Sequence, residues 1–175
     1  MKKKKKFLIP FSGLKLGTHH FTFEVNDTFF EKRDYSILKQ GKVNVEVVFE
    51  KKETMMILNF SLQGEVVLSC NRCNDDLSLA ISNKFKLIYT FGNEDMSNDV
   101  VIVLHPDTHE IDIEQQLYEF ITISIPSRVI HEENECNQEM LETLNKYLLL
   151  KENKENKENN TDNVDPRWSA LKGLN

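Results

Sequence analysis

Three cysteines and one histidine are the residues of this chain whose types and spacing suggest chemistry. Cys70 and Cys73 form a C-x2-C pair in the segment VVLSCNRCNDDL, and His131 and Cys136 lie five residues apart further along the chain. Thiolates and a neutral imidazole are ligands that tetrahedral zinc prefers in proteins. The four residues together predict one structural zinc site, although the H-x4-C spacing is not among the usual zinc-finger spacings.

Two other interpretations of the cysteines stay open. The C-x2-C pair could carry redox chemistry, but it lies among strand-like segments rather than at a helix start, where a thiolate is stabilised. The three thiols could also be inert and bind no metal. A structural disulfide is disfavoured, because the number of cysteines is odd and the start of the chain has no signal-peptide pattern.

The sequence carries no motif that predicts catalysis. His131 and Glu132 begin like the H-E-x-x-H helix of metalloproteases, but residue 135 is Glu, so the second histidine is missing. There is no Gly-rich phosphate loop and no G-x-S-x-G nucleophile motif. We therefore expect a protein that is not an enzyme and that has no small-molecule substrate.

The elements that must position the cysteines are strands. Apolar residues recur at every second position in five segments, 21–25, 43–49, 56–62, 77–81 and 85–91. This period of two predicts half-buried antiparallel strands. The C-x2-C pair falls between the third and fourth segments, at a hairpin tip where two thiolates can face one ion. Asn74 follows the pair and tolerates the left-handed backbone of such a turn. Gly64 indicates a break or a bulge.

The pattern changes to helical spacing after Pro106. Apolar residues predict an amphipathic helix that begins near Asp112, a suitable N-cap, and ends at or before Pro126. Apolar residues in 140–148 predict a second helix. The fold class is therefore α+β, with a mainly antiparallel sheet or partly open barrel and one or two helices in the second half.

Composition divides the chain into four parts. A basic disordered start at 1–6 and a single α+β domain at 7–150 precede a Lys/Glu/Asn-rich linker at 151–163 and a short docking helix at 164–175. The linker repeats a Lys-Glu-Asn triplet without any apolar residue, so we expect a flexible coil there.

The last part has the residue types of a docking element. Trp168, Leu171 and Leu174 can share one helix face, and Arg167 stands beside the tryptophan. Aromatic residues with a neighbouring arginine are common at binding hot spots. We expect these four residues to bind a partner or, equally, to cover a groove of their own domain.

The distribution of charge restricts the partners. The whole chain carries −6; Lys2 to Lys6 contribute +5, the linker −1 and the last twelve residues +1, so residues 7–150 carry −11. A body this acidic repels phosphate, which makes a general nucleic-acid surface a poor expectation. The lysine run could contact RNA, but a solvated end is the commoner role. No apolar run is long enough to span a membrane, so we expect a cytoplasmic protein without membrane contact.

The ordered set of these motifs resembles one family. The SCNRC segment, the helix leading through EFITISIPSRVIHEENEC and the terminal DPRWSALKGL resemble the YceD-type large ribosomal RNA accumulation proteins of bacteria and plastids. The resemblance spans about the last two thirds of the chain. The five-lysine start and the Lys-Glu-Asn linker are particular to this chain.

The resemblance implies a non-enzymatic accessory factor for synthesis, processing or stability of large-subunit ribosomal RNA. An acidic body meets a basic ribosomal protein or an rRNA-processing protein more readily than it meets RNA directly. Two alternatives remain: a thiol- or metal-dependent redox enzyme that uses the C-x2-C pair, and a direct RNA-binding module led by the basic amino terminus.

Overall fold

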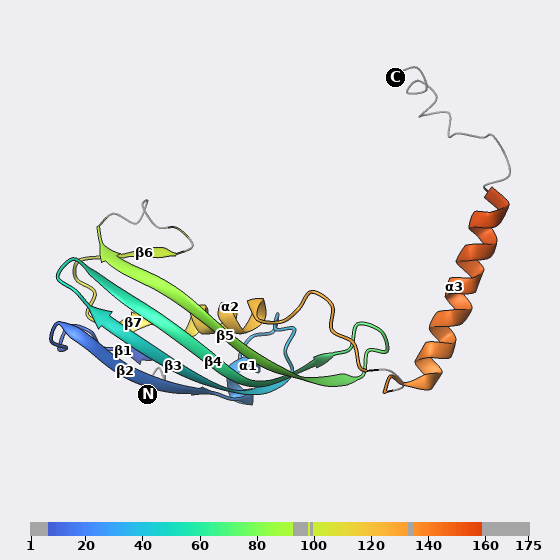
Figure 1. Ribbon diagram of the computed structural model, residues 1–175, viewed down its shortest axis with the longest axis horizontal. Helices are drawn as coiled ribbons and strands as arrows, with labels where there is room; N and C mark the ends of the chain where they lie inside the picture. The colour runs from blue at the N-terminus through green and yellow to red at the C-terminus, as the bar shows by residue number, and fades with distance from the viewer. Residues whose placement is uncertain (1–6, 93–97, 99, 133–134, 159–175) are drawn as a thin grey trace, which may run out of the picture.

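The computed structural model describes residues 7–92, 98, 100–132 and 135–158 (Figure 1). Its main element is an open, five-stranded sheet in the order β2-β3-β4-β5-β6. Neighbouring strands from β2 to β5 are antiparallel, and β6 runs parallel to β5. The strands are β2 Gly17–Val25, β3 Gln40–Lys51, β4 Met55–Ser69, β5 Asp76–Phe91 and β6 Val101–Leu104. The predicted α+β class is confirmed, and the sheet is open rather than a closed barrel.

One face of the sheet is apolar and is covered by the helix α2, Glu114–Ile123. The Phe120 ring stacks on Phe85 of β5 with centroids 4.3 Å apart, and it meets the Phe60 ring of β4 edge-on at 5.1 Å. The N-cap of the helix is Ile113 rather than the expected Asp112, whose carboxylate accepts a hydrogen bond of 3.0 Å from the Glu114 amide. The predicted helix between Asp112 and Pro126 is therefore confirmed.

The sequence pattern did not predict the edge strand β6 or three further short elements, which lie outside the main sheet. The strands β1, Leu8–Ile9, and β7, Ile111–Asp112, pair antiparallel, and the four-residue helix α1 spans Asp27–Phe30. The Phe7 ring packs edge-on against Phe29 of α1, with centroids 5.1 Å apart. Elements of two to four residues are too short to show a period, so only their tertiary packing defines them.

Two predicted interruptions of the strands are wrong. The β3–β4 and β4–β5 registers run without a shift through Gly64, so this glycine is neither a break nor a bulge. A Cβ at position 64 would lie 2.2 Å from the Lys42 carbonyl oxygen, so a glycine is needed for close approach of two backbones. The segments 77–81 and 85–91 also belong to one strand, β5. Cross-strand pairing keeps the polar residues between them extended.

The predicted second helix is confirmed as α3, Gln138–Glu158, which leads away from the sheet (Figure 1). It continues through residues 151–158, where a flexible coil was expected. Lys and Glu favour helix, and this stretch has no Gly or Pro, so a helix that has started continues through it. The basic start at 1–6 and residues 159–175 lie outside the described residues. No described helix has the length and apolar character to cross a membrane.

Candidate metal centre

The turn between β4 and β5 presents the C-x2-C pair. The Asn74 amide donates to the Cys70 carbonyl oxygen at 2.9 Å, and the Cys70 amide donates to the Asp75 carbonyl oxygen at 2.8 Å. Asn74 has φ of 65°, in the left-handed region that asparagine tolerates. The predicted hairpin tip and its Asn turn are therefore confirmed.

A second segment, which approaches this hairpin from the end of α2, is held by the two residues between the cysteines, Asn71 and Arg72. The Asn71 amide donates to the Val129 carbonyl oxygen at 2.8 Å, and the Asn71 side-chain oxygen accepts from the Val129 amide at 2.6 Å. The Arg72 guanidinium donates to the His131 carbonyl oxygen at 3.4 Å. These bonds fix the segment beside the turn, so that His131 reaches the cysteine sulfurs.

The structure brings Cys70, Cys73, His131 and Cys136 together. One ligand atom from each residue lies within 4.8 Å of the others, and the cluster could hold a metal ion. The Cys73 sulfur is 3.3 Å from His131 Nδ1, and the Cys136 sulfur is 3.9 Å from both Nδ1 and the Cys70 sulfur. All three thiols are free and buried. A disulfide would need sulfurs about 2.05 Å apart, so the cluster is not a disulfide.

One hydrogen bond determines which ring nitrogen of His131 faces the sulfurs. Nε2 lies 3.1 Å from the Asp76 carbonyl oxygen, which can only accept, so Nε2 carries the proton. Nδ1 therefore presents its lone pair to the cysteines in the neutral ring. A backbone carbonyl in this role is typical of metal-ligating histidines, because it fixes the tautomer and the ring orientation.

The hairpin stabilises the ionised form of its two thiols. Burial raises the pKa of the Cys70 thiol, but the backbone amides of Cys73 and Arg72 outweigh that effect and lower the pKa to about 5. Burial also opposes ionisation of Cys73, and the amides of Asn137 and Asp75 lower the pKa of its thiol. Thiolates are the form of cysteine that can bind a metal, so the turn favours the form of both cysteines that could hold an ion.

The other two cluster residues, Cys136 and His131, respond differently to the same environment. Burial raises the pKa of the Cys136 thiol to about 11, with the neighbouring thiols Cys73 and Cys70 adding to the effect. For His131, burial favours the neutral ring, but hydrogen bonds to Cys70 and Cys73 outweigh it and raise the pKa of the imidazole. A cation at the centre of the cluster would reverse both preferences, since it favours a third thiolate and a neutral imidazole.

The helix α3 begins directly after the cluster residue Cys136. Asn137 follows Cys136 and caps the helix, because its side-chain oxygen accepts from the Glu139 and Met140 amides at 3.1 and 3.3 Å. The Asn137 side-chain amide also donates to the Asp75 carboxylate at 3.2 Å. Sequence reasoning missed the positioning residues Asn71, Asp76 and Asn137. Their only sequence signal is that each lies within three residues of a cysteine.

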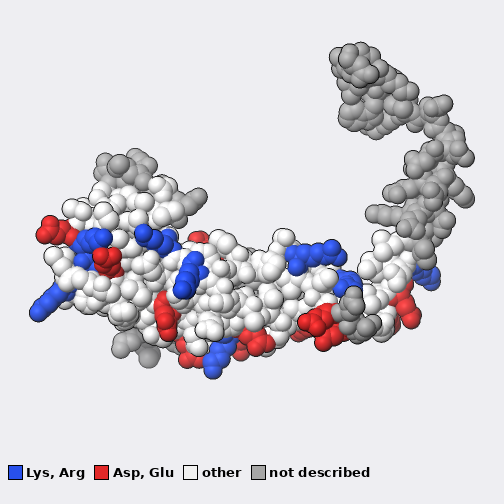
Figure 2. Space-filling model, in the orientation of Figure 1, with Lys and Arg blue, Asp and Glu red and all other residues white. Residues whose placement is uncertain are grey.

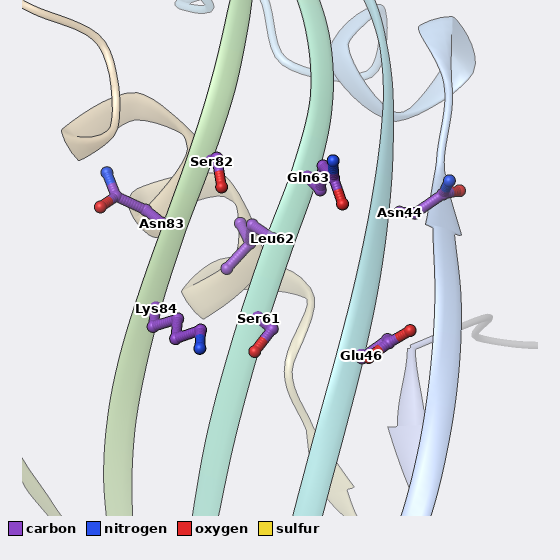
Figure 3. Close-up of a pocket in the computed structure, with 8 residues that line it drawn as sticks. All are labelled: Asn44, Glu46, Ser61, Leu62, Gln63, Ser82, Asn83 and Lys84. Atoms are coloured by element: carbon purple, nitrogen blue, oxygen red, sulfur yellow. The ribbon is translucent and has the colours of Figure 1, made fainter.

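A separate hollow of about 590 Å³ lies on the polar face of the sheet (Figure 3). The side chains that line it come from β3, β4 and β5, and they are Asn44, Glu46, Ser61, Leu62, Gln63, Ser82, Asn83 and Lys84. Among the described residues, no hydrogen bond or ion pair connects Glu46, Ser61 and Lys84.

The part of the chain that contains the cluster matches a known family. The family model described as "Large ribosomal RNA subunit accumulation protein YceD" matches residues 58–175. The chain belongs to the YceD family. The matched range contains all four cluster residues as well as Arg167, Trp168, Leu171 and Leu174, which lie outside the described residues.

One relative extends the similarity of this YceD chain toward its amino terminus. The Bacillus subtilis (strain 168) protein described as "Uncharacterized protein YlbN" is 28% identical over 155 residues. The alignment covers 87% of this chain and 84% of that protein. No solved structure matches the chain. The family description relates YceD proteins to accumulation of large-subunit ribosomal RNA, and the cluster is the candidate site within the matched part of this member.

Proposed function

We propose that this chain is a non-enzymatic accessory factor for synthesis, processing or stability of large-subunit ribosomal RNA. The observation that carries the proposal is the match of the YceD family model over residues 58–175. The three free, buried thiols favour a reducing compartment, and the cytoplasm is the proposed site of action. The factor is proposed to act by holding a partner rather than by transforming a substrate.

We propose one structural zinc ion as the cofactor. A regular tetrahedron with Zn–S bonds of about 2.3 Å and a Zn–N bond of about 2.0 Å has S–S edges of roughly 3.8 Å and S–N edges of roughly 3.5 Å. The sulfur–sulfur distance of 3.9 Å and the sulfur–nitrogen distances of 3.3 and 3.9 Å in the cluster support this ion. Four protein ligands leave no open position for a substrate, so the metal is structural.

A basic ribosomal protein or an rRNA-processing protein is the proposed partner. Residues 7–150 carry −11, and Lys and Arg side chains are scattered among Asp and Glu on the face in Figure 2, where they form no continuous stripe. Such a surface favours association with a cationic partner and opposes direct contact with phosphate. Arg167, Trp168, Leu171 and Leu174 remain predicted docking residues, on a partner or on this chain.

Deletion of the gene followed by complementation tests the proposed role. We expect the deletion to reduce the ratio of large-subunit to small-subunit ribosomal RNA, and the wild-type chain to restore it. Cys70→Ser should restore it poorly, whereas His105→Ala, at an exposed histidine remote from the cluster in sequence, should restore it fully. An unchanged rRNA ratio in the deletion strain would contradict the proposal.

RNA binding by the purified protein separates an adaptor from an RNA-binding module. We expect weak binding to ribosomal RNA at physiological salt, and a chain that begins at Phe7 should lose most of it, because the charge of +5 in Lys2 to Lys6 is removed. A full-length variant with these five lysines changed to glutamine controls for chain length. Tight, salt-resistant binding by the shortened chain would favour direct RNA recognition instead.

A further inference from the structure

The helix α3 exposes an apolar face to solvent. Four residues at positions i, i+4, i+7 and i+8 form this face, which we call the α3 stripe: Met140, Leu144, Tyr147 and Leu148. Their exposed fractions are 43%, 39%, 67% and 50%, in the same order. This spacing places all four along one side of the helix. A contiguous apolar face of this kind on a helix marks a surface that another element covers.

The α3 stripe has a fixed position at its amino-terminal end. Asn137 caps the helix beside Cys136, and Leu141, seven residues before Leu148 and therefore at the edge of the same helix face, packs against the hydrophobic core. No element among the described residues covers the stripe itself, and Figure 1 shows the helix leading away from the sheet. The occupant must therefore be a segment outside the described residues or another molecule.

We propose that the C-terminal segment 166–174 of the same chain packs on the α3 stripe. Its apolar residues Trp168, Leu171 and Leu174 recur at helical spacing, so they can form a complementary apolar face. Residues 159–165 separate Glu158, where α3 ends, from Pro166, and this length is within the range of about 2–8 residues that commonly joins two packed helices.

The connecting residues are also long enough to reach the stripe. Seven extended residues span up to about 23 Å. The helix from Glu158 back to Leu144 is roughly 21 Å long, at about 1.5 Å per residue. Pro166 can therefore lie level with Leu144, and the segment that follows can lie along the stripe. A short tether keeps the segment close to the helix, which favours docking within one chain over docking between chains.

Net charge is compatible with the same arrangement. The segment 166–174 carries Arg167 and Lys172 and no acidic residue. Residues 138–148 of α3 carry Glu139, Glu142 and Lys146, a net charge of −1, so the two elements attract each other weakly. The inference goes beyond the proposed function, because it concerns the isolated chain and holds whether or not the chain supports ribosomal RNA accumulation.

Tryptophan fluorescence of the full-length protein tests the inference, because Trp168 is the single tryptophan of the chain. We expect emission at shorter wavelength than that of the same protein in denaturant, and weak quenching by acrylamide. Changing Leu144 and Leu148 to Ser should shift the emission to longer wavelength and increase the quenching. The matched control is the double variant Leu16→Ser and Ile123→Ser, at apolar residues that are exposed elsewhere, and it should leave both readouts unchanged.

Three results would overturn the inference. Wild-type emission equal to that of the denatured protein would show that Trp168 is not covered. Short-wavelength emission that the Leu144 and Leu148 changes leave unaffected would place Trp168 on another surface. Emission that depends on protein concentration would indicate a second copy as the occupant. Far-UV circular dichroism checks that each variant folds, and Tyr147→Ser, at the most exposed residue of the stripe, gives an independent measurement.

Discussion

His131 and Asp76 are joined by a hydrogen bond in which the imidazole Nε2–H donates to the backbone carbonyl oxygen at 3.1 Å. Asp76 is the first residue of β5, so the strand that follows the C-x2-C turn also orients the histidine. The lone pair of Nδ1 is thereby aimed at sulfur without any carboxylate partner. The backbone of β5 supplies this orientation. A side-chain substitution at position 76 would therefore leave the Asp76 carbonyl oxygen in place.

The metal content of the purified protein is the first prediction. We expect close to one zinc per chain, and Cys70→Ser should lose it, because the variant removes a ligand whose sulfur is 3.9 Å from that of Cys136. A ligand present at about a thousand times its dissociation constant adds about 4 kcal/mol to the free energy of unfolding. Metal analysis and denaturant titration measure both effects, with His105→Ala as the control. Wild-type protein without metal, purified under reducing conditions, would contradict the zinc proposal.

Local loosening on removal of the metal is the second prediction. A chelator should speed amide hydrogen exchange at Asn71 and Val129 and at the first turn of α3, since their bonds hold the two halves of the cluster together. The pairing between Phe23 and Val45, in the β2–β3 ladder, should keep its protection. Exchange that rises equally in both regions would instead indicate that the metal supports the whole domain.

The third prediction concerns close packing inside the sheet. Gly64→Ala should lower the free energy of unfolding by about 3 kcal/mol or more, because its Cβ would stand 2.2 Å from the Lys42 carbonyl oxygen and 2.6 Å from the Val43 Cα. Both are backbone atoms that cannot move independently of the ladder. Gly13→Ala is the matched control, since nothing lies within 4 Å of a Cβ there. Denaturant unfolding of both variants checks the difference, and equal stabilities would be inconsistent with it.

The fourth prediction concerns Tyr89, whose buried hydroxyl has no hydrogen-bond partner among the described residues. Burial, reinforced by the negative charges of Asp112 and Glu119, raises the pKa of this phenol in the folded protein. The unfolded chain therefore releases the proton first, and stability falls as the pH rises above about 10, by up to about 1.4 kcal/mol per pH unit.

Tyr89→Phe removes this loss. The variant should be at least as stable as the wild type at pH 7, since it removes a buried hydroxyl without a partner, and it should lose less stability above pH 10. Denaturant titration at several pH values measures the difference between the two proteins. Tyr35→Phe, at an exposed tyrosine outside the α3 stripe, serves as the control. Parallel pH profiles for Tyr89→Phe and wild type would refute the assignment.

Local patterns predicted the features that depend on neighbouring residues. Alternation located the long strands, and Asn74 after the C-x2-C pair indicated the left-handed turn that the structure contains. Periodicity cannot relate His131 and Cys136 to Cys70 and Cys73, because the two pairs are far apart in the sequence. They were grouped because all four residues are types that bind zinc. The sequence therefore identified the members of the cluster, but not the bonds of Asn71 and Asn137 that hold them together.

Features that depend on tertiary context were missed. Gly64 looked like a break because glycine is rare within strands, but the close approach of the β3 backbone requires it there. β1 and β7 have two residues each, and only their pairing defines them. The end of α3 was placed too early, because a lack of apolar residues predicts the absence of packing but not the absence of helix.

The contact between Cys73 and His131 joins residues 58 positions apart, and this separation has a consequence for biosynthesis. At about 5–20 residues per second, His131 is added to the nascent chain roughly 3 to 12 seconds after Cys73. Throughout that interval the hairpin thiols exist without the other half of their cluster. A small-molecule disulfide could take two electrons and two protons from this pair, and the resulting Cys70–Cys73 disulfide would occupy both sulfurs before the histidine arrives. Vectorial synthesis therefore predicts that the cluster assembles best where thiols stay reduced.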